Sequence, residues 1–175
     1  MSRPVNFTHQ HLEVRALSTL EERIARLEDL EAIRYLDAQY CRHLDDGNWD
    51  DLMTLFTEDG AFDGLSHPVG KAEMKAFFAG LADGGLSDFW HFITNMEIDL
   101  HGDTATVRSF LWQPCVSDGV ASIAAGRYTD TLVKIDGHWL YRVKQVRFHF
   151  FGPLEEGWAE NQFALDTAKR AAVHP

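Results

Sequence analysis

The sequence predicts a single α+β domain, in which N-terminal helices pack on a strongly curved antiparallel sheet and enclose an apolar pocket. Three observations support this prediction. The first half of the chain repeats apolar residues at helical spacing, and the second half contains four long runs typical of strands. The 175 residues, 45% of them hydrophobic, are enough for one core but too few for two ordinary domains. Helices that precede a sheet in this way usually cover one of its faces.

The chain is expected to divide into three parts. Residues 1–16 show no periodicity and contain Pro4, so they predict a flexible N-terminal arm. Residues 17–152 hold the periodic segments and form the predicted domain. Residues 153–175 are interpreted as a C-terminal tail.

The first helix is predicted to begin at Ser18, which has the spacing of a capping box with Glu21. Apolar residues then recur every three or four positions from Leu20 to Leu44, which gives the helix one apolar face. The Asp-Asp-Gly run at 45–47 is typical of a helix end.

Two shorter helices and an edge strand should follow. Asn48 can cap the first of these helices, and a turn at 58–60 ends it. Residues 61–64 predict the edge strand, and residues 70–81 predict the other helix.

Four strands are predicted in the second half, over about 89–100, 104–115, 121–135 and 138–151. The turns between them contain Gly102, Gly119 and Gly137, each beside an aspartate, which favours hairpins because Asp-Gly pairs supply the positive φ of primed turns. An antiparallel meander with strands this long requires twist, bulges and curvature.

The composition excludes several classes of partner. The formal charge is -11, and no run of Lys or Arg makes a basic face, so nucleic acid is not an expected partner. No segment approaches the roughly 20 apolar residues of a membrane span, and residues 1–10 lack the apolar stretch of a signal peptide. Cys41 and Cys115 are too few for a disulfide framework, which favours a reducing, cytoplasmic location.

The sequence also lacks the motifs of common cofactor and metal sites. It contains no HExxH, no glycine-rich phosphate loop, no dinucleotide fingerprint and no GxSxG elbow. We therefore expect no metal and no cofactor, and chemistry that depends on side-chain acids and bases.

Tyr40, Asp45 and His91 are the candidate catalytic residues. Tyr40 lies on the apolar face of the first helix, Asp45 ends that helix, and His91 stands among aromatic residues at the start of the first long strand. If Asp45 accepts a hydrogen bond from one imidazole nitrogen, the other nitrogen is free to act as a general base. Tyr40 would donate to an oxygen that gains negative charge. Spacing alone favours the plainer interpretation, a satisfied core histidine and a turn aspartate.

A second group of residues could bind the substrate. The candidate lining of the pocket comprises Phe62, Phe110, Trp112 and Phe148, although aromatic residues on strands more often form plain core. Arg127, Arg147 and His149 also lie on predicted strands, but period-two alternation does not decide whether their side chains face the pocket. Asp130 is expected to pair with an arginine, for structure or for catalysis.

Several strings, from about Leu20 to Phe151, resemble the SnoaL-like branch of the nuclear transport factor 2-like (cystatin-like cone) superfamily. They are Tyr-Cys-Arg-His-Leu-Asp-Asp-Gly-Asn-Trp at 40–49 with Leu-Phe at 55–56, His-Phe-Ile-Thr-Asn at 91–95, Gly-Arg-Tyr-Thr-Asp at 126–130 and Asp-Gly-His-Trp at 136–139. The resemblance implies a cone fold. It is less informative about activity, because the superfamily includes isomerases, several kinds of lyase and noncatalytic binding proteins.

Within that branch, the chain is most similar to bile acid 7α-dehydratase and hexachlorocyclohexane dehydrochlorinase-like enzymes. This resemblance implies a base dyad of His91 and Asp45, with Tyr40 at the position of the dehydratase tyrosine. The additional acidic or histidine residue of the dehydratases has no counterpart in 104–115.

The resemblance further implies a cofactor-independent lyase, either a dehydratase or a related elimination enzyme, including one that releases formaldehyde. Its substrate would be a small aromatic or polycyclic molecule. An isomerase and a noncatalytic binding or assembly protein are the alternatives. A homotrimer or homodimer is expected, in which the tail closes the pocket or a subunit interface.

Overall fold

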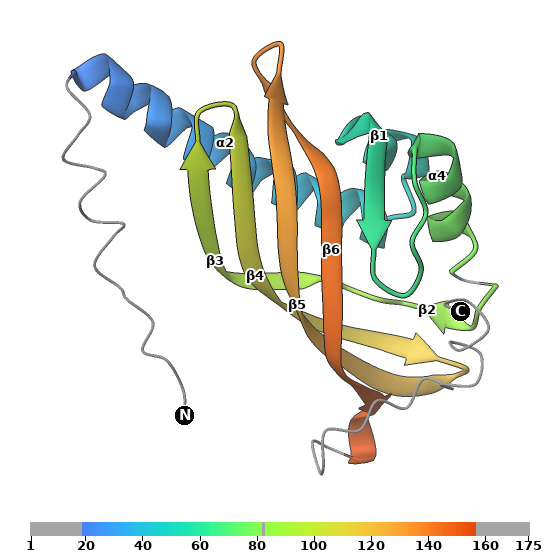
Figure 1. Cartoon of the computed structure of the whole chain (residues 1–175). Helices are drawn as coiled ribbons and strands as arrows, with labels where there is room; N and C mark the ends of the chain where they lie inside the picture. The colour runs from blue at the N-terminus through green and yellow to red at the C-terminus, as the bar shows by residue number, and fades with distance from the viewer. Residues whose placement is uncertain (1–18, 82, 157–175) are drawn as a thin grey trace, which may run out of the picture.

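The computed structural model describes residues 19–81 and 83–156. The predicted arm and the part of the tail beyond residue 156 lie outside these residues. The described helices are α2 (Leu20–Asp45), α3 (Trp49–Thr54) and α4 (Lys71–Ala79). The strands are β1 (Phe56–Asp63), β2 (Leu86–Ser87), β3 (Phe92–His101), β4 (Thr104–Ser117), β5 (Val120–Ile135) and β6 (His138–Pro153), followed by the 3-10 turn η2 (Leu154–Glu156). The predicted α+β class is confirmed (Figure 1).

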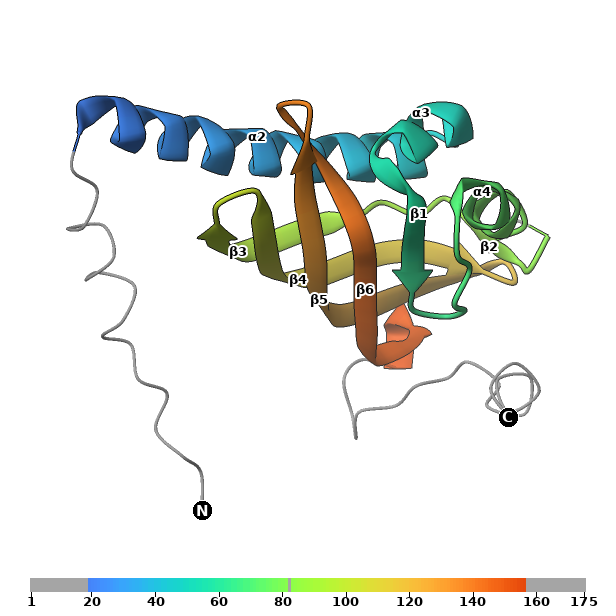
Figure 2. The same ribbon diagram turned by 45° about the horizontal axis from the view of Figure 1, so that its top comes forward.

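Helix α2 begins one residue later than predicted. Its N-cap is Thr19, whose hydroxyl accepts from the Glu22 backbone N–H at 3.2 Å, while the Glu22 carboxylate accepts from the Thr19 N–H at 3.2 Å. The Ser18–Glu21 pairing was wrong because Ser-Thr-Leu-Glu-Glu fits a capping box in two adjacent registers. In Figure 2 the N-terminal turns of α2 project beyond the sheet, and the apolar residues there are exposed: Leu20, Ile24 and Leu27.

The sheet is mixed rather than wholly antiparallel. Its order is β1-β6-β5-β4-β2, with β3 also paired to β4, and β1 runs parallel to β6. The prediction of an antiparallel sheet was therefore wrong at this edge. It was wrong because alternation within β1 reveals a strand but not its direction, which depends on the pairing with β6. Strand β1 is also longer than the predicted 61–64.

Close backbone approach and bulges curl the long strands. Strands β5 and β6 each have 16 residues, and their pairing shifts register between Ala125 and Gly126 and again between Thr131 and Leu132. A Cβ on Gly126 would lie 2.6 Å from the Arg147 carbonyl oxygen, so only glycine permits this approach. Such bulges increase twist and bend the strands. The sheet is therefore strongly curled, and the helices lie along one of its faces (Figure 2).

The core fills the space between the C-terminal half of α2 and the inner face of the sheet. Ile33, Leu36, Tyr40 and Leu44, spaced three and four apart, are buried. Phe78 of α4 and Phe56 of β1 are buried in the same cluster. This packing places the last turn of α2, which includes Asp45, beside the start of β3.

Candidate active site

Asp45 and His91 are joined by two hydrogen bonds. His91 Nδ1 lies 2.6 Å from Asp45 Oδ1, and the His91 backbone N–H donates to Asp45 Oδ2 at 3.0 Å. The His91 side chain is only 7% exposed and the Asp45 side chain 16%. A carboxylate can only accept, so Nδ1 carries a proton, and in the neutral form of the ring the free lone pair is then on Nε2. The hydrogen bond that the sequence suggested is present.

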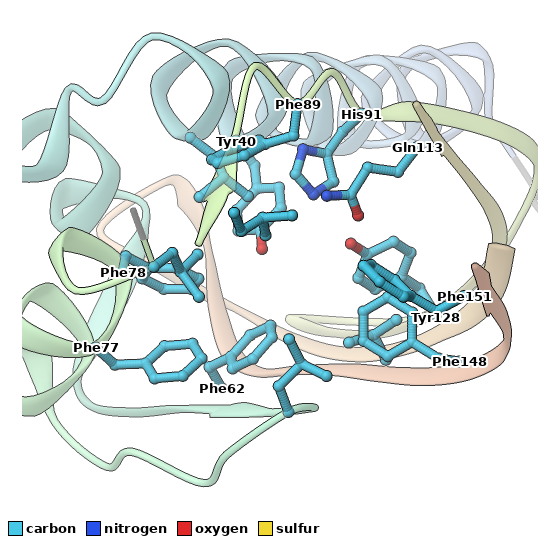
Figure 3. Close-up of a pocket in the computed structure, with 15 residues that line it drawn as sticks. Tyr40, Phe62, Phe77, Phe78, Phe89, His91, Gln113, Tyr128, Phe148 and Phe151 are labelled. Carbon is cyan, nitrogen blue, oxygen red and sulfur yellow. The ribbon is translucent and has the colours of Figure 1, made fainter. Parts of the chain in front are cut away.

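The His91 ring borders an enclosed pocket (Figure 3). Aromatic and aliphatic side chains make up most of its wall, including Phe62, Phe77, Phe78, Phe89, Phe148 and Phe151. The space inside is small, about 40 Å³ for the centre of a water-sized sphere. One water requires about 10–15 Å³ by this kind of measure, so the pocket suits a small molecule and a fused ring system would have to displace the wall.

On its other side the dyad borders an open groove between α2 and β3. His91, Asp45, Cys41 and Asp37 all line this groove, whose volume is about 530 Å³. The imidazole therefore separates the enclosed pocket from a space that is open to solvent.

Tyr40 lies in the pocket wall with its hydroxyl unsatisfied. The residue is fully buried, and its Oη has no hydrogen-bond partner. Burial is the main reason that its pKa is raised above the ordinary value, so the phenol keeps its proton. Tyr40 is therefore a neutral hydrogen-bond donor facing the pocket.

The sequence did not single out Gln113 and Tyr128, which also line the pocket. Gln113 follows Leu111 by two positions on β4, and both are buried on the inner face. Tyr128 is buried on β5. The period-two alternation of β4 could have identified Gln113 once one inward residue of the strand was known.

Only two of the six predicted substrate-binding residues line the pocket, Phe62 and Phe148. The other four, Phe110, Trp112, Arg127 and His149, do not line this pocket and instead border a groove on the outer face of the sheet. Phe110 and Trp112 are 43% and 41% exposed. They alternate with the buried Leu111 and Gln113, so the face opposite to the one assumed points inward.

Asp130 pairs with a lysine rather than the expected arginine. The ammonium of Lys144 donates to Asp130 Oδ2 at 2.9 Å and to Asp37 Oδ1 at 2.7 Å, and all three residues are buried. The same nitrogen lies 4.3–4.6 Å from the ring centroids of Tyr40, Tyr128 and Tyr141. Arg147 instead pairs with Asp63 at 2.6 Å.

The pKa values of this buried cluster reflect one cation shared by two carboxylates. Burial raises the pKa of Asp130 to about 6, although Lys144 opposes the rise. Burial disfavours the charged form of Lys144, but Asp130 and Asp37 together hold its pKa above the ordinary value. The cluster lies behind the tyrosines of the pocket wall and supports them.

Other chemistry has little support in the described residues. Burial raises the pKa of Cys41 to about 12 and that of Cys115 to about 11, so neither thiol is an activated nucleophile. Within residues 19–81 and 83–156, no group of three or more His, Cys, Asp or Glu side chains is arranged to hold a metal ion. None of the described helices combines the length and the apolar character needed to cross a membrane.

Known structures share this architecture. A protein of Novosphingobium aromaticivorans provisionally named a scytalone dehydratase is 25% identical, with a TM-score of 0.68 over 75% of this chain and 91% of that one. A protein of the same organism provisionally named an aromatic ring hydroxylase is 27% identical, with a TM-score of 0.66 over 73% and 94%. Hexachlorocyclohexane dehydrochlorinase LinA-type3 of Novosphingobium barchaimii shares the fold at 18% identity, with a TM-score of 0.69 over 82% and 99%.

Sequence comparison gives the family. No curated protein matches the chain at a significant level. The family model described as a SnoaL-like domain matches residues 25–144, which span α2 to β6 and include the dyad, Tyr40, Tyr128 and Lys144. The chain therefore belongs to the SnoaL-like domain family.

Proposed function

We propose that this protein is a cofactor-independent lyase that acts on a small cyclic substrate by general base catalysis. The observation that carries the proposal is the doubly hydrogen-bonded His91–Asp45 pair at the wall of an enclosed apolar pocket. The resemblance of the fold to structures named as a dehydratase and a dehydrochlorinase supports a lyase.

In the proposed reaction, His91 Nε2 takes a proton from a ring carbon. The electrons of that C–H bond form a new double bond, and the bond from the adjacent carbon to the leaving group breaks with its electrons. Asp45 holds the imidazole in the required tautomer and stabilises the imidazolium. Tyr40 donates to the atom on which negative charge grows. Water is our first choice of leaving group, and the departing hydroxide takes up a proton as the C–O bond breaks. Halide release follows the same steps without that proton. Formaldehyde release would instead begin with proton removal from a hydroxymethyl oxygen: the O–H electrons would form the C=O bond of formaldehyde, and the C–C bond would break with its electrons on the ring carbon, which takes up a proton.

Two other functions use the same geometry. An isomerase would employ the same base and return the proton to a different carbon of the ring. A noncatalytic binding protein would use the pocket but not the free lone pair of His91. The small enclosed volume and the lone pair directed at it favour the enzyme.

Proton removal can be tested without knowing the leaving group. Cyclic ketones with a β-hydroxy or β-halo substituent would be incubated with the protein in D₂O, and NMR would follow both α-deuterium exchange and elimination. We expect His91→Ala and Asp45→Asn to slow both by at least about a hundredfold, the usual contribution of a general base. His67→Ala is the matched control, because His67 is half-exposed and away from the pocket. Unchanged rates in both dyad variants would refute the base.

We also propose that the protein is a homo-oligomer, a trimer or a dimer. Large aromatic side chains are exposed on this protein: Phe110 and Trp112 on the outer face of β4, and Trp90 and Phe92 at the start of β3. Apolar clusters of this kind often mark subunit contacts. Sedimentation of Phe110→Ser/Trp112→Ser should show a smaller species than the wild type, and an unchanged mass would contradict this face as the contact.

A further inference from the structure

Three polar side chains turn into the pocket without a partner. Tyr40, Tyr128 and Gln113 are 0%, 2% and 4% exposed. Tyr40 Oη has no hydrogen-bond partner, and no hydrogen bond joins the Tyr128 hydroxyl or the Gln113 amide to any other described side chain or backbone group. Figure 3 shows the polar ends of all three directed toward the empty centre.

Tyr141 gives the internal comparison. It is as buried as Tyr40 and Tyr128 and packs around the same lysine, but it does not line the pocket. Its hydroxyl donates to Asp37 at 2.7 Å and accepts from Lys144 at 3.3 Å. The two tyrosines that lack partners are therefore the two that line the pocket. Buried polar groups are nearly always satisfied, so these groups are arranged for something that enters the pocket.

The chemistry of the three groups indicates an oxygen acceptor. Burial raises the pKa of Tyr40 and of Tyr128 above the ordinary value, so both remain O–H donors. The Gln113 amide adds two N–H donors. A carbonyl oxygen, with two lone pairs, or a hydroxyl oxygen can accept from these donors.

The electrostatics disfavour an anion at this place. Among residues 19–81 and 83–156, no Lys or Arg side chain lines the pocket. Lys144 lies behind the tyrosine rings, and its three donors are used by Asp37, Asp130 and Tyr141. The cluster carries two carboxylates for one ammonium, and Asp45 adds a third carboxylate nearby. A carboxylate would thus lose its water without gaining a counter-charge.

We propose that Tyr40, Tyr128 and Gln113 form a binding site for one uncharged oxygen of a single-ring compound, so that the pocket selects neutral ketones or alcohols over carboxylates. This proposal specifies the substrate class of the proposed function, and it rests on that function only because both use the same pocket. Tyr128 and Gln113 thereby become determinants of specificity.

The test uses three ring-matched probes, which are cyclohexanone, cyclohexanecarboxylate and methylcyclohexane. Their dissociation constants would be measured by ligand-observed NMR titration at neutral pH. We expect cyclohexanone to bind about tenfold more tightly than either of the others. Tyr128→Phe and Gln113→Leu should each reduce its advantage over methylcyclohexane by about fivefold, the worth of one hydrogen bond. Thr129→Val is the control, because Thr129 is next to Tyr128 and exposed on the other face.

Two outcomes would overturn the proposal: binding of the carboxylate as tightly as the ketone, or a ketone preference that both variants leave unchanged. Circular dichroism would confirm that the variants are folded, and the conservative Gln113→Met provides a second replacement. His91→Ala separates this proposal from the catalytic one. It removes the base but none of the three donors, so it should keep the ketone preference whether or not the wild type catalyses elimination.

Discussion

Replacing Lys144 with methionine should strongly destabilise the protein. The variant keeps most of the side-chain volume but removes the only ammonium that pairs with Asp37 and Asp130, which are 4% and 0% exposed. Breaking a buried ion pair by deleting one partner usually costs about 3–5 kcal/mol, because the other charge is left buried. Here two carboxylates are left, so we expect a loss at the upper end of that range at pH 7.5.

The destabilisation should depend on pH with a definite sign. Without Lys144, which opposes the rise in the pKa of Asp130, the folded-state pKa of Asp130 rises further above its unfolded value. At pH values between the unfolded-state and folded-state pKa of this carboxyl, the folded state binds more protons than the unfolded state. The free energy of unfolding therefore falls as pH rises and increases as pH falls. The loss in Lys144→Met should therefore be smaller at pH 5 than at pH 7.5.

Urea unfolding, followed by circular dichroism at both pH values, measures this effect. The triple variant Asp37→Asn/Asp130→Asn/Lys144→Met is the matched comparison, because it removes all three charges together. It should recover at least about half of the lost stability, since uncharged polar groups are less costly to bury than carboxylates. A loss below about 1 kcal/mol for Lys144→Met, or a loss that does not change with pH, would refute the reasoning.

Two further predictions concern the fold. Burial raises the folded-state pKa of Asp130 from 3.8 to about 6, so the contribution of this carboxyl to stability should decline as pH rises from about 4 through 6. The free energy of unfolding of Asp130→Asn, measured across this range, should lack that decline. Parallel curves for the variant and the wild type would contradict the prediction. Gly126→Ala should lower the free energy of unfolding by about 1–3 kcal/mol, because its Cβ would lie 2.6 Å from the Arg147 carbonyl oxygen. Thermal unfolding measures this loss, with Thr129→Ala as the control. An unchanged melting temperature in Gly126→Ala would argue against the close approach.

The sequence predicted most elements closely because local rules govern them. The hairpin turns at Asp118-Gly119 and Asp136-Gly137 have positive φ at both residues, as the Asp-Gly signal indicates. The long strands that these turns connect begin and end within a few residues of the predicted bounds. The direction of β1 was not predictable in this way, because it depends on pairing with β6, about 80 residues later.

The same difference between local and long-range contacts applies to the candidate site. The contact between Asp45 and His91 was one of two interpretations that the residues allowed, and the family resemblance, not the spacing, favoured it. The inward face of β4 was not predictable, because period-two alternation gives two sets of residues and does not say which set is inside. For this reason Phe110 and Trp112 were expected in the pocket, where Gln113 of the same strand is found instead.

The amino-acid sequence by itself determined the order of helices and strands, the turns and the residues able to act as base and donor. These depend on neighbours a few positions away. Only the tertiary structure decided which strand face is enclosed, that Lys144 rather than an arginine joins Asp37 and Asp130, and that the hydroxyls of Tyr40 and Tyr128 face a shared hollow. Each of these depends on the curl of the sheet against α2, which brings together side chains about 90 to 105 positions apart.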